Sequence, residues 1–129
     1  MVISLVALFL DRLSKWFILN NPDFTYSFIE LYKNEKFYFI SLDPILLNAL
    51  IFIVLAVLLI ILFKCEKNKL GFYLIFFGGL SNFFDRIIFG YVIDWITVPF
   101  SAFNIADLMI IVGIIIIGFS TVKDSKYGV

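Results

Sequence analysis

Apolar residues fall into four long runs that are separated by shorter polar segments. The runs cover about residues 2–19, 44–63, 70–86 and 105–120. The second run is uncharged over its whole length, and at a rise of about 1.5 Å per residue it matches the ~30 Å hydrocarbon core of a bilayer. Asp43 before Pro44 supplies an N-cap and a first-turn proline for that helix. We therefore expect an all-α integral membrane protein with four transmembrane helices, built as a single domain over residues 1–129.

The distribution of basic residues predicts how these helices are oriented. Lysine-rich segments between membrane spans favour the cytoplasmic side. Two segments are lysine-rich, the link between the second and third runs and the C-terminal tail: Lys64, Lys67, Lys69, Lys123 and Lys126. Both termini are therefore expected in the cytoplasm, and the segments 20–42 and 85–104 are expected on the outer side.

The outer segment 21–43 alternates large aromatic residues with smaller or polar ones. Phe24, Tyr26 and Phe28 form one alternating stretch, and Phe37 and Phe39 form another after a polar interval. Period-two alternation on both sides of a polar interval is typical of a hairpin. The segment therefore predicts a small extracytoplasmic β-hairpin element, whose aromatic side chains suit the membrane interface.

Composition excludes several classes of chemistry. Hydrophobic residues make up 63% of the chain, the formal net charge is zero, and histidine is absent. The absence of histidine removes Ser-His-Asp and Cys-His catalysis and most zinc sites. The sequence has no basic stripe of the kind that binds nucleic acid, so no nucleic-acid partner is expected. The single cysteine, Cys65, lies in the lysine-rich link and is interpreted as an incidental cytoplasmic thiol. The first apolar run lacks the charged leader and the small-residue cleavage site of a secretory signal peptide, which favours a retained span.

Four aspartates lie in or beside the apolar runs. A charged carboxylate near hydrocarbon costs free energy, so each of them is expected to have a partner or a function. They are Asp11, Asp85, Asp94 and Asp107. Asp11 and Lys15 are spaced i,i+4, so they share one helix face and can pair. That pair is interpreted either as a structural ion pair or as support for a functional site.

Asp94 and Asp107 are the strongest candidates for chemistry. The loop between them contains Pro99 and can fold back, so that the end of the third span meets the start of the fourth. Two carboxylates that meet there cannot both ionise cheaply, which leaves one general base and one general acid on a shared water. This is the chemistry of aspartic proteolysis, and it needs no metal or cofactor. A proton-coupled transporter and a metal site made by Asp85 with these two residues remain as alternatives; the lack of histidine disfavours the metal site.

At these residues the chain resembles the bacterial lipoprotein signal peptidases, also called signal peptidase II. Residues 11–15 (Asp-Arg-Leu-Ser-Lys) are similar to the Asp-Gln-x-Ser-Lys block of that family, and residues 21–28 are similar to its Asn-x-Gly-Ala-Ala-Phe-Ser block. Residues 81–94 are similar to Gly-Asn-x-x-Asp-Arg followed by Gly-x-Val-x-Asp. Residues 103–107 (Phe-Asn-Ile-Ala-Asp) are similar to Phe-Asn-x-Ala-Asp.

The resemblance implies a site and a substrate. Asp94 and Asp107 fall on the catalytic positions of the family. The resemblance also implies a monomer in the bacterial cytoplasmic membrane, with its active site at the extracytoplasmic face and no cofactor. Its partners would be membrane lipids and prolipoproteins whose cysteine carries diacylglycerol, cut just before that cysteine. The site-supporting positions fall on Asp11, Lys15, Asn21, Asn82, Asp85, Arg86, Asn104 and Ala106.

Three departures from the family pattern bear on substrate fit. Residues 23–25 are Asp-Phe-Thr where the family has Gly-Ala-Ala, and this bulk reshapes the expected cleft. Arg12 replaces a glutamine, and Ser81 replaces a glycine. A catalytically silent relative that binds lipidated peptides without cutting them therefore remains an alternative.

Overall fold

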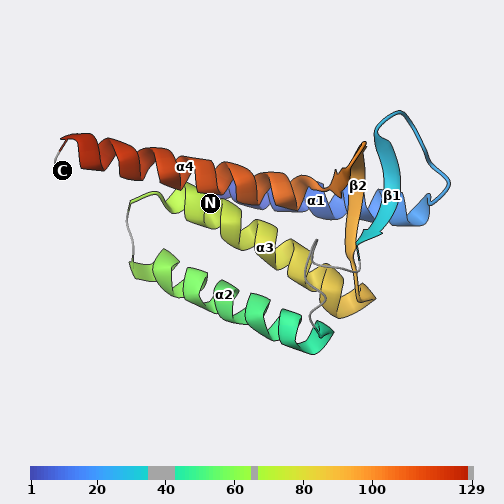
Figure 1. Ribbon diagram of the computed structural model, residues 1–129, viewed down its shortest axis with the longest axis horizontal. Helices are drawn as coiled ribbons and strands as arrows, with labels where there is room; N and C mark the ends of the chain where they lie inside the picture. The colour runs from blue at the N-terminus through green and yellow to red at the C-terminus, as the bar shows by residue number, and fades with distance from the viewer. Residues whose placement is uncertain (35–42, 65–66, 128–129) are drawn as a thin grey trace.

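In the part of the chain that the structure describes, four helices pack lengthwise, and three short strands lie at one end of them (Figure 1). The computed structural model describes residues 1–34, 43–64 and 67–127, with side chains as far as residue 122. The prediction of a mostly helical chain with a small β element is confirmed. The elements are α1 (Val2–Asn20), β1 (Ile29–Asn34), α2 (Pro44–Lys64), α3 (Lys69–Phe89), β2 (Val92–Val98), β3 (Ser101–Phe103) and α4 (Ile105–Tyr127).

Three of the helices are long and apolar enough to cross a membrane. These candidate spans are Pro44–Lys64, Lys69–Phe89 and Ile105–Val122, and they agree with three of the four predicted spans. Helix α1 has 19 residues, which is a sufficient length, but it carries three charged residues in its second half. Among the described residues, three helices are thus candidate spans by length and composition, and the role of α1 depends on where its charges lie.

Glycines bring α3 and α4 into close contact. A Cβ at Gly78 would lie 2.5 Å from the carbonyl oxygen of Ala106, and one at Gly113 would lie 2.6 Å from the carbonyl oxygen of Gly71. Only small residues allow two backbones to approach this closely, and they are the usual contact residues between helices in lipid. Helix α1 packs against both α3 and α4, whereas α2 packs mainly against α3.

Substitution of Gly78 is expected to separate the helices at the start of α4. In Gly78→Ala, the added methyl would collide with backbone, which cannot move aside like a flexible side chain. Overpacking of this kind costs roughly 1–3 kcal/mol. We expect a clearly lower midpoint of thermal unfolding in micelles. Gly118→Ala is the matched control, because nothing lies within 4 Å of its added carbon. Equal midpoints for both variants would contradict the close contact.

The β element differs from the predicted hairpin. The sheet has the order β1-β2-β3 and is antiparallel throughout, so β1 pairs with β2, far along the chain, with Tyr32 opposite Asp94. The stretch around Tyr26 is not a strand but a turn closed by a single bridge to Ile29. The predicted second arm, with Phe37 and Phe39, lies outside the described residues, as does Cys65. Alternation of side chains indicates extended structure but not its partner, so the pairing of β1 with β2 was not predicted.

Helix ends fix how the chain enters and leaves the sheet. The carboxylate of Asp43 accepts hydrogen bonds from the N–H groups of Ile45 (2.8 Å) and Leu46 (3.3 Å), which confirms the predicted N-cap of α2. Helix α3 continues past the predicted end to Phe89 and stops at Gly90, whose φ of 81° is left-handed. This is the conformation that favours glycine at a helix C-terminus. It turns the chain directly into β2.

Candidate active site

The first turn of α4 is held by a reciprocal cap between Asn104 and Asp107. The Asp107 N–H donates to Oδ1 of Asn104 (2.9 Å), and the Asn104 N–H donates to Oδ2 of Asp107 (3.2 Å). This is the geometry of a capping box, in which two free helix donors are satisfied at once. It fixes the direction of the Asp107 carboxylate.

Asn104 also connects Asp107 to Asp94. Its Nδ2 donates to Oδ1 of Asp94 (2.6 Å) and to Oδ1 of Asn82 (3.1 Å). Asn82 in turn donates from Nδ2 to Oδ1 of Asp107 (2.8 Å). The side chains of Asn104 and Asn82 therefore link the two aspartates: Asn104 contacts both of them, and Asn82 contacts Asp107 and Asn104. Asp94 lies on strand β2, beyond the end of α3, and the turn at Gly90 leads the chain from that helix into the strand.

Lys15 lies buried beneath these two amides. Its ammonium contacts Oδ2 of Asp11 (3.0 Å), Oδ2 of Asp85 (2.8 Å) and Oδ1 of Asn82 (2.9 Å), so all three of its donors are used. The side chains of Lys15, Asp11 and Asp85 are at most 1% exposed. A buried cation with two carboxylates is tolerated only when its geometry is this complete. The predicted i,i+4 pair of Asp11 and Lys15 is thus one part of a larger cluster.

Asp11 and Asp85 tie this cluster to the backbone around the two candidate residues. Asp11 accepts the N–H of Ala106 in the first turn of α4 (2.8 Å), where the helix dipole also favours an anion. Asp85 accepts the N–H of Ile93, the neighbour of Asp94, in a longer contact of 3.4 Å. The cluster therefore holds both the start of α4 and the strand that carries Asp94.

Asp94 has an unusual environment for a carboxylate. Burial raises the pKa of Asp94 to about 6, and the charge of Asp107 contributes to this increase. Hydrogen bonds from Asn34 and Asn104 and the charge of Lys15 act in the opposite direction. Asn34, on β1, donates to Oδ2 of Asp94 (2.9 Å), so each oxygen of this carboxylate has an amide donor. A carboxyl group with this pKa can accept and release a proton near neutral pH.

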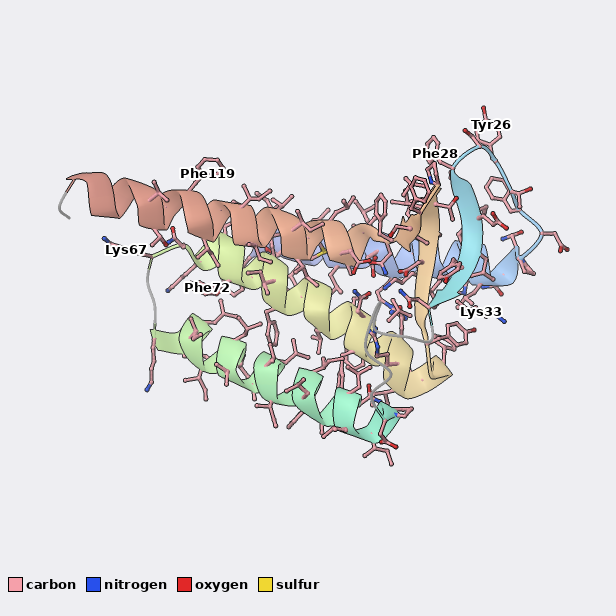
Figure 2. All side chains as sticks on the ribbon, in the orientation of Figure 1. Tyr26, Phe28, Lys33, Lys67, Phe72 and Phe119 are labelled. Atoms are coloured by element: carbon pink, nitrogen blue, oxygen red, sulfur yellow. The ribbon has the colours of Figure 1, made fainter. Side chains whose placement is uncertain are left out.

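A cavity of about 600 Å³ opens beside the two aspartates. Its polar end is formed by Asn34, Asn82, Arg86, Asp94 and Asp107. Its other walls are apolar and come from α2, with contributions from α3, the sheet and Ile110. Figure 2 shows nitrogen and oxygen atoms concentrated at the sheet end of the helices. The α2 residues of the wall are Leu47, Leu50, Ile51, Val54, Leu55 and Leu58.

The structure brings together nearly all of the residues singled out by sequence. Nine of the ten meet at the sheet end, either in the hydrogen-bonded cluster or on the cavity wall; the exception is Asn21. That residue is exposed after the end of α1, and its Nδ2 donates to the carbonyl of Phe17 (2.8 Å). The nine are Asp11, Lys15, Asn82, Asp85, Arg86, Asp94, Asn104, Ala106 and Asp107.

Asn34, Arg12 and Ser81 contact this site but were not selected from the sequence as members of it. Asn34 reaches Asp94 only because β1 pairs with β2, a long-range register that no local pattern reveals. Arg12 was noted only as a departure from the family block, yet it pairs with Asp85. Its departure from the family pattern was the only indication in the sequence that Arg12 contacts the site.

Loss of the Asn34 amide is expected to move the ionisation of Asp94. One hydrogen bond to a carboxylate contributes roughly 1 kcal/mol, which corresponds to somewhat less than one pH unit. In Asn34→Ala, the pKa of Asp94 therefore rises above its value of about 6. Where the pH–activity profile has a limb that depends on the ionisation of Asp94, we expect that limb to shift toward higher pH. The control is Lys33→Ala, which removes an exposed neighbour on the same strand. A profile unchanged in Asn34→Ala would show that the contact does not influence Asp94.

Comparison with known families gives a clear match. A sequence model of the family described as "Signal peptidase (SPase) II" covers residues 3–123. A lipoprotein signal peptidase of Caldicellulosiruptor bescii is 37% identical over 81 residues, which are 57% of this chain and 54% of that protein. One of Streptococcus thermophilus is 30% identical over 91 residues, which are 66% of this chain and 55% of that protein. The chain thus spans about half the length of these curated relatives.

Solved structures agree on the fold. One described as a bacterial membrane enzyme superposes with a TM-score of 0.83 at 24% identity, over 96% of this chain and 87% of that one. A second, with the same description, has a TM-score of 0.76 at 26% identity, over 95% and 92%. Fold and site together define a helical membrane protein with paired carboxylates at the polar end of an apolar cavity. The chain belongs to the signal peptidase II family.

Proposed function

We propose that the chain is a membrane aspartic endopeptidase that removes the signal peptide from prolipoproteins whose cysteine carries diacylglycerol, cutting just before that cysteine. One observation carries the proposal: Asn104 joins Asp94 and Asp107 at the polar end of an apolar cavity, because its Nδ2 donates to Asp94 and its backbone N–H donates to Asp107. Family membership supports both the reaction and the substrate class.

The proposal includes a membrane arrangement with four spans. Helix α1 is the fourth, because Asp11 and Lys15 are fully buried against the other helices, and Arg12, whose side chain is 35% exposed, pairs with the buried Asp85. Lys67 lies at the end of the molecule opposite the sheet (Figure 2), and basic links favour the cytoplasm. Both termini are then cytoplasmic, and the site faces outward from the bacterial cytoplasmic membrane. The chain acts as one domain and as a monomer.

The reaction is a hydrolysis shared between two carboxyl groups. A water molecule bound between Asp94 and Asp107 gives one proton to the ionised partner as its oxygen attacks the scissile carbonyl. The protonated partner donates to the departing nitrogen as the C–N bond breaks. The products are the carboxylate of the signal peptide and the free amine of the lipidated cysteine. Asn104 holds both carboxyl groups in place, while Asn82 and Arg86 are placed to bind carbonyl oxygens of the substrate.

The apolar part of the cavity suits the lipid of this substrate. The wall from α2 is built of leucine, isoleucine and valine side chains, and burial of each acyl CH₂ against such a surface contributes roughly 0.8 kcal/mol. Side chains of α3 and Ile110 of α4 line the same cavity, so the wall from α2 is continuous with theirs. The acyl chains can therefore stay in apolar surroundings while the peptide reaches the polar end.

Cleavage of a matched pair of substrates tests this function. The chain in liposomes is incubated with a prolipoprotein peptide whose cysteine carries diacylglycerol, and with the same peptide unmodified. Mass spectrometry should find a product that begins at the modified cysteine, and little from the unmodified peptide. Cleavage should persist in the presence of a chelator; its loss would indicate a metal enzyme. Binding of the lipidated peptide without any cleavage would instead indicate a silent relative.

A further inference from the structure

Arg12 adds a second cation to the buried cluster, and the proposed hydrolysis gives it no role. Its guanidinium pairs with Oδ1 of Asp85 and lies 3.4 Å from both the carbonyl oxygen and Oγ of Ser81. The Arg12 side chain is 35% exposed, while Asp85 is fully buried. The charge therefore reaches inward from the edge of the site.

Ser81 connects Arg12 to the other buried carboxylate. The Ser81 hydroxyl donates to Oδ2 of Asp11 (2.6 Å), and Ser81 is itself fully buried. Arg12 and Ser81 are two of the positions at which the chain departs from the family pattern, and the structure places them in contact. Both departures thus serve the same pair of carboxylates, Asp11 and Asp85.

Arg12 and Lys15 divide Asp85 between them. Arg12 pairs with Oδ1 of Asp85, and Lys15 pairs with Oδ2. Lys15 consequently keeps one of its three donors for Oδ1 of Asn82, and this contact orients the Asn82 amide so that Nδ2 points at Asp107. A chain of contacts therefore runs from Arg12 through Asp85, Lys15 and Asn82 to Asp107.

The charges at this end of the molecule also balance when Arg12 is counted. Around Asp94, α1 contributes Asp11, Arg12 and Lys15, α3 contributes Asp85 and Arg86, α4 contributes Asp107, and β1 contributes the neutral Asn34 and Tyr32. These described residues include four carboxylates and three cations. One proton shared by Asp94 and Asp107 then makes the site neutral, which is the protonation state that a general acid and a general base require.

We propose that Arg12 is a positioning residue that sets the protonation state of the Asp94–Asp107 pair by balancing Asp85. The expected change in the pH profile of cleavage rests on the proposed function, whereas the expected change in the titration of Asp94 does not. Without Arg12, the buried site has one excess negative charge and retains a second proton to higher pH. The pair then lacks its base over part of the pH range.

The kinetic test compares Arg12→Gln, Arg12→Lys and Lys69→Gln. Glutamine keeps a polar side chain but removes the charge, lysine keeps the charge, and Lys69 is an exposed cation at the far end of α3. In Arg12→Gln, the acid limb of kcat/KM should move up by about one pH unit, the size expected for a unit charge near a poorly solvated pair. KM should change less than two-fold or so. Arg12→Lys and Lys69→Gln should keep the parental profile.

A second measurement separates this inference from the proposed function. The carboxyl ¹³C signal of Asp94 is titrated in micelles for the parent and the three variants, whether or not the parent cleaves substrate. The Asp94 midpoint should rise in Arg12→Gln alone. An unchanged midpoint in Arg12→Gln, or an equal rise in Lys69→Gln, overturns the role of Arg12. A parent that shows the shift but no cleavage would count against the proposed function only.

Discussion

Replacing either Asp94 or Asp107 by asparagine is expected to abolish cleavage while leaving the fold intact. Each substitution removes one of two groups that must exchange protons with water and with the leaving nitrogen. Loss of a general acid or base typically costs about 10²–10⁴-fold, and a shared proton couples the two groups, so we expect at least about 10³-fold in kcat. The loss should be similar for the two variants and should not increase when they are combined.

The fold should survive because asparagine has nearly the same shape and keeps an acceptor oxygen. Asp94→Asn can still accept from one of its two amide partners, Asn34 or Asn104. The midpoint of thermal unfolding and the affinity for the lipidated peptide should therefore stay close to the parental values. Asp43→Asn is the matched control, because asparagine is an equally good N-cap for α2. Parental turnover in either Asp94→Asn or Asp107→Asn would refute the paired-carboxylate mechanism.

The second large effect is expected on stability, in Lys15→Met. Methionine fills a similar volume but leaves Asp11 and Asp85 buried without their shared cation. Removing one partner of a buried ionic cluster costs about 3–5 kcal/mol, because the remaining charges lose their compensation. We expect Lys15→Met to unfold at a much lower temperature in micelles, or to be recovered only in small amounts.

Two comparisons make the Lys15 result specific. Lys69→Met removes an exposed lysine from the first turn of α3 and should change the unfolding midpoint little. Lys15→Met combined with Asp85→Asn should recover part of the lost stability, because one uncompensated carboxylate is then neutral. Equal midpoints for Lys15→Met and Lys69→Met would mean that the cluster contributes nothing to the folded state.

The helices were readily predicted from the sequence, because a membrane span is a local property. A run of apolar residues specifies its own helix, and Asp43 and Pro44 mark where one begins. The first helix is harder to assign, since Asp11, Arg12 and Lys15 interrupt its apolar run. Those charges become acceptable only when the packing that buries them is known.

The strands were predicted less well, because a sheet depends on partners distant in sequence. Alternating aromatics indicated extended structure before Asp43 but could not indicate β2 as the partner of β1. The contact of Asn34 with Asp94 follows entirely from that register. The convergence of Asp94 and Asp107 was more accessible, since both lie close in sequence to helix ends on either side of one short loop.

The site therefore divides into a part encoded locally and a part assembled by the fold. The capping box of Asn104 and Asp107 is a local feature, because its two residues are only three positions apart in the sequence. The contact between Arg12 and Asp85 joins α1 to α3 and has no local signature. Departures from a family pattern gave the only indication of it, and they acquire a physical meaning once the two side chains are seen together.

Coupled titration of the two carboxyl groups tests the central claim most directly. Carboxyl ¹³C signals of Asp94 and Asp107 are followed against pH in micelles, in the parent and in the two asparagine variants. If the groups share one proton, both signals should respond in two separated steps, and Asp107→Asn should leave Asp94 titrating in a single step at lower pH. Independent single steps, unaffected by replacement of the partner, would contradict a shared proton and with it the hydrolytic mechanism.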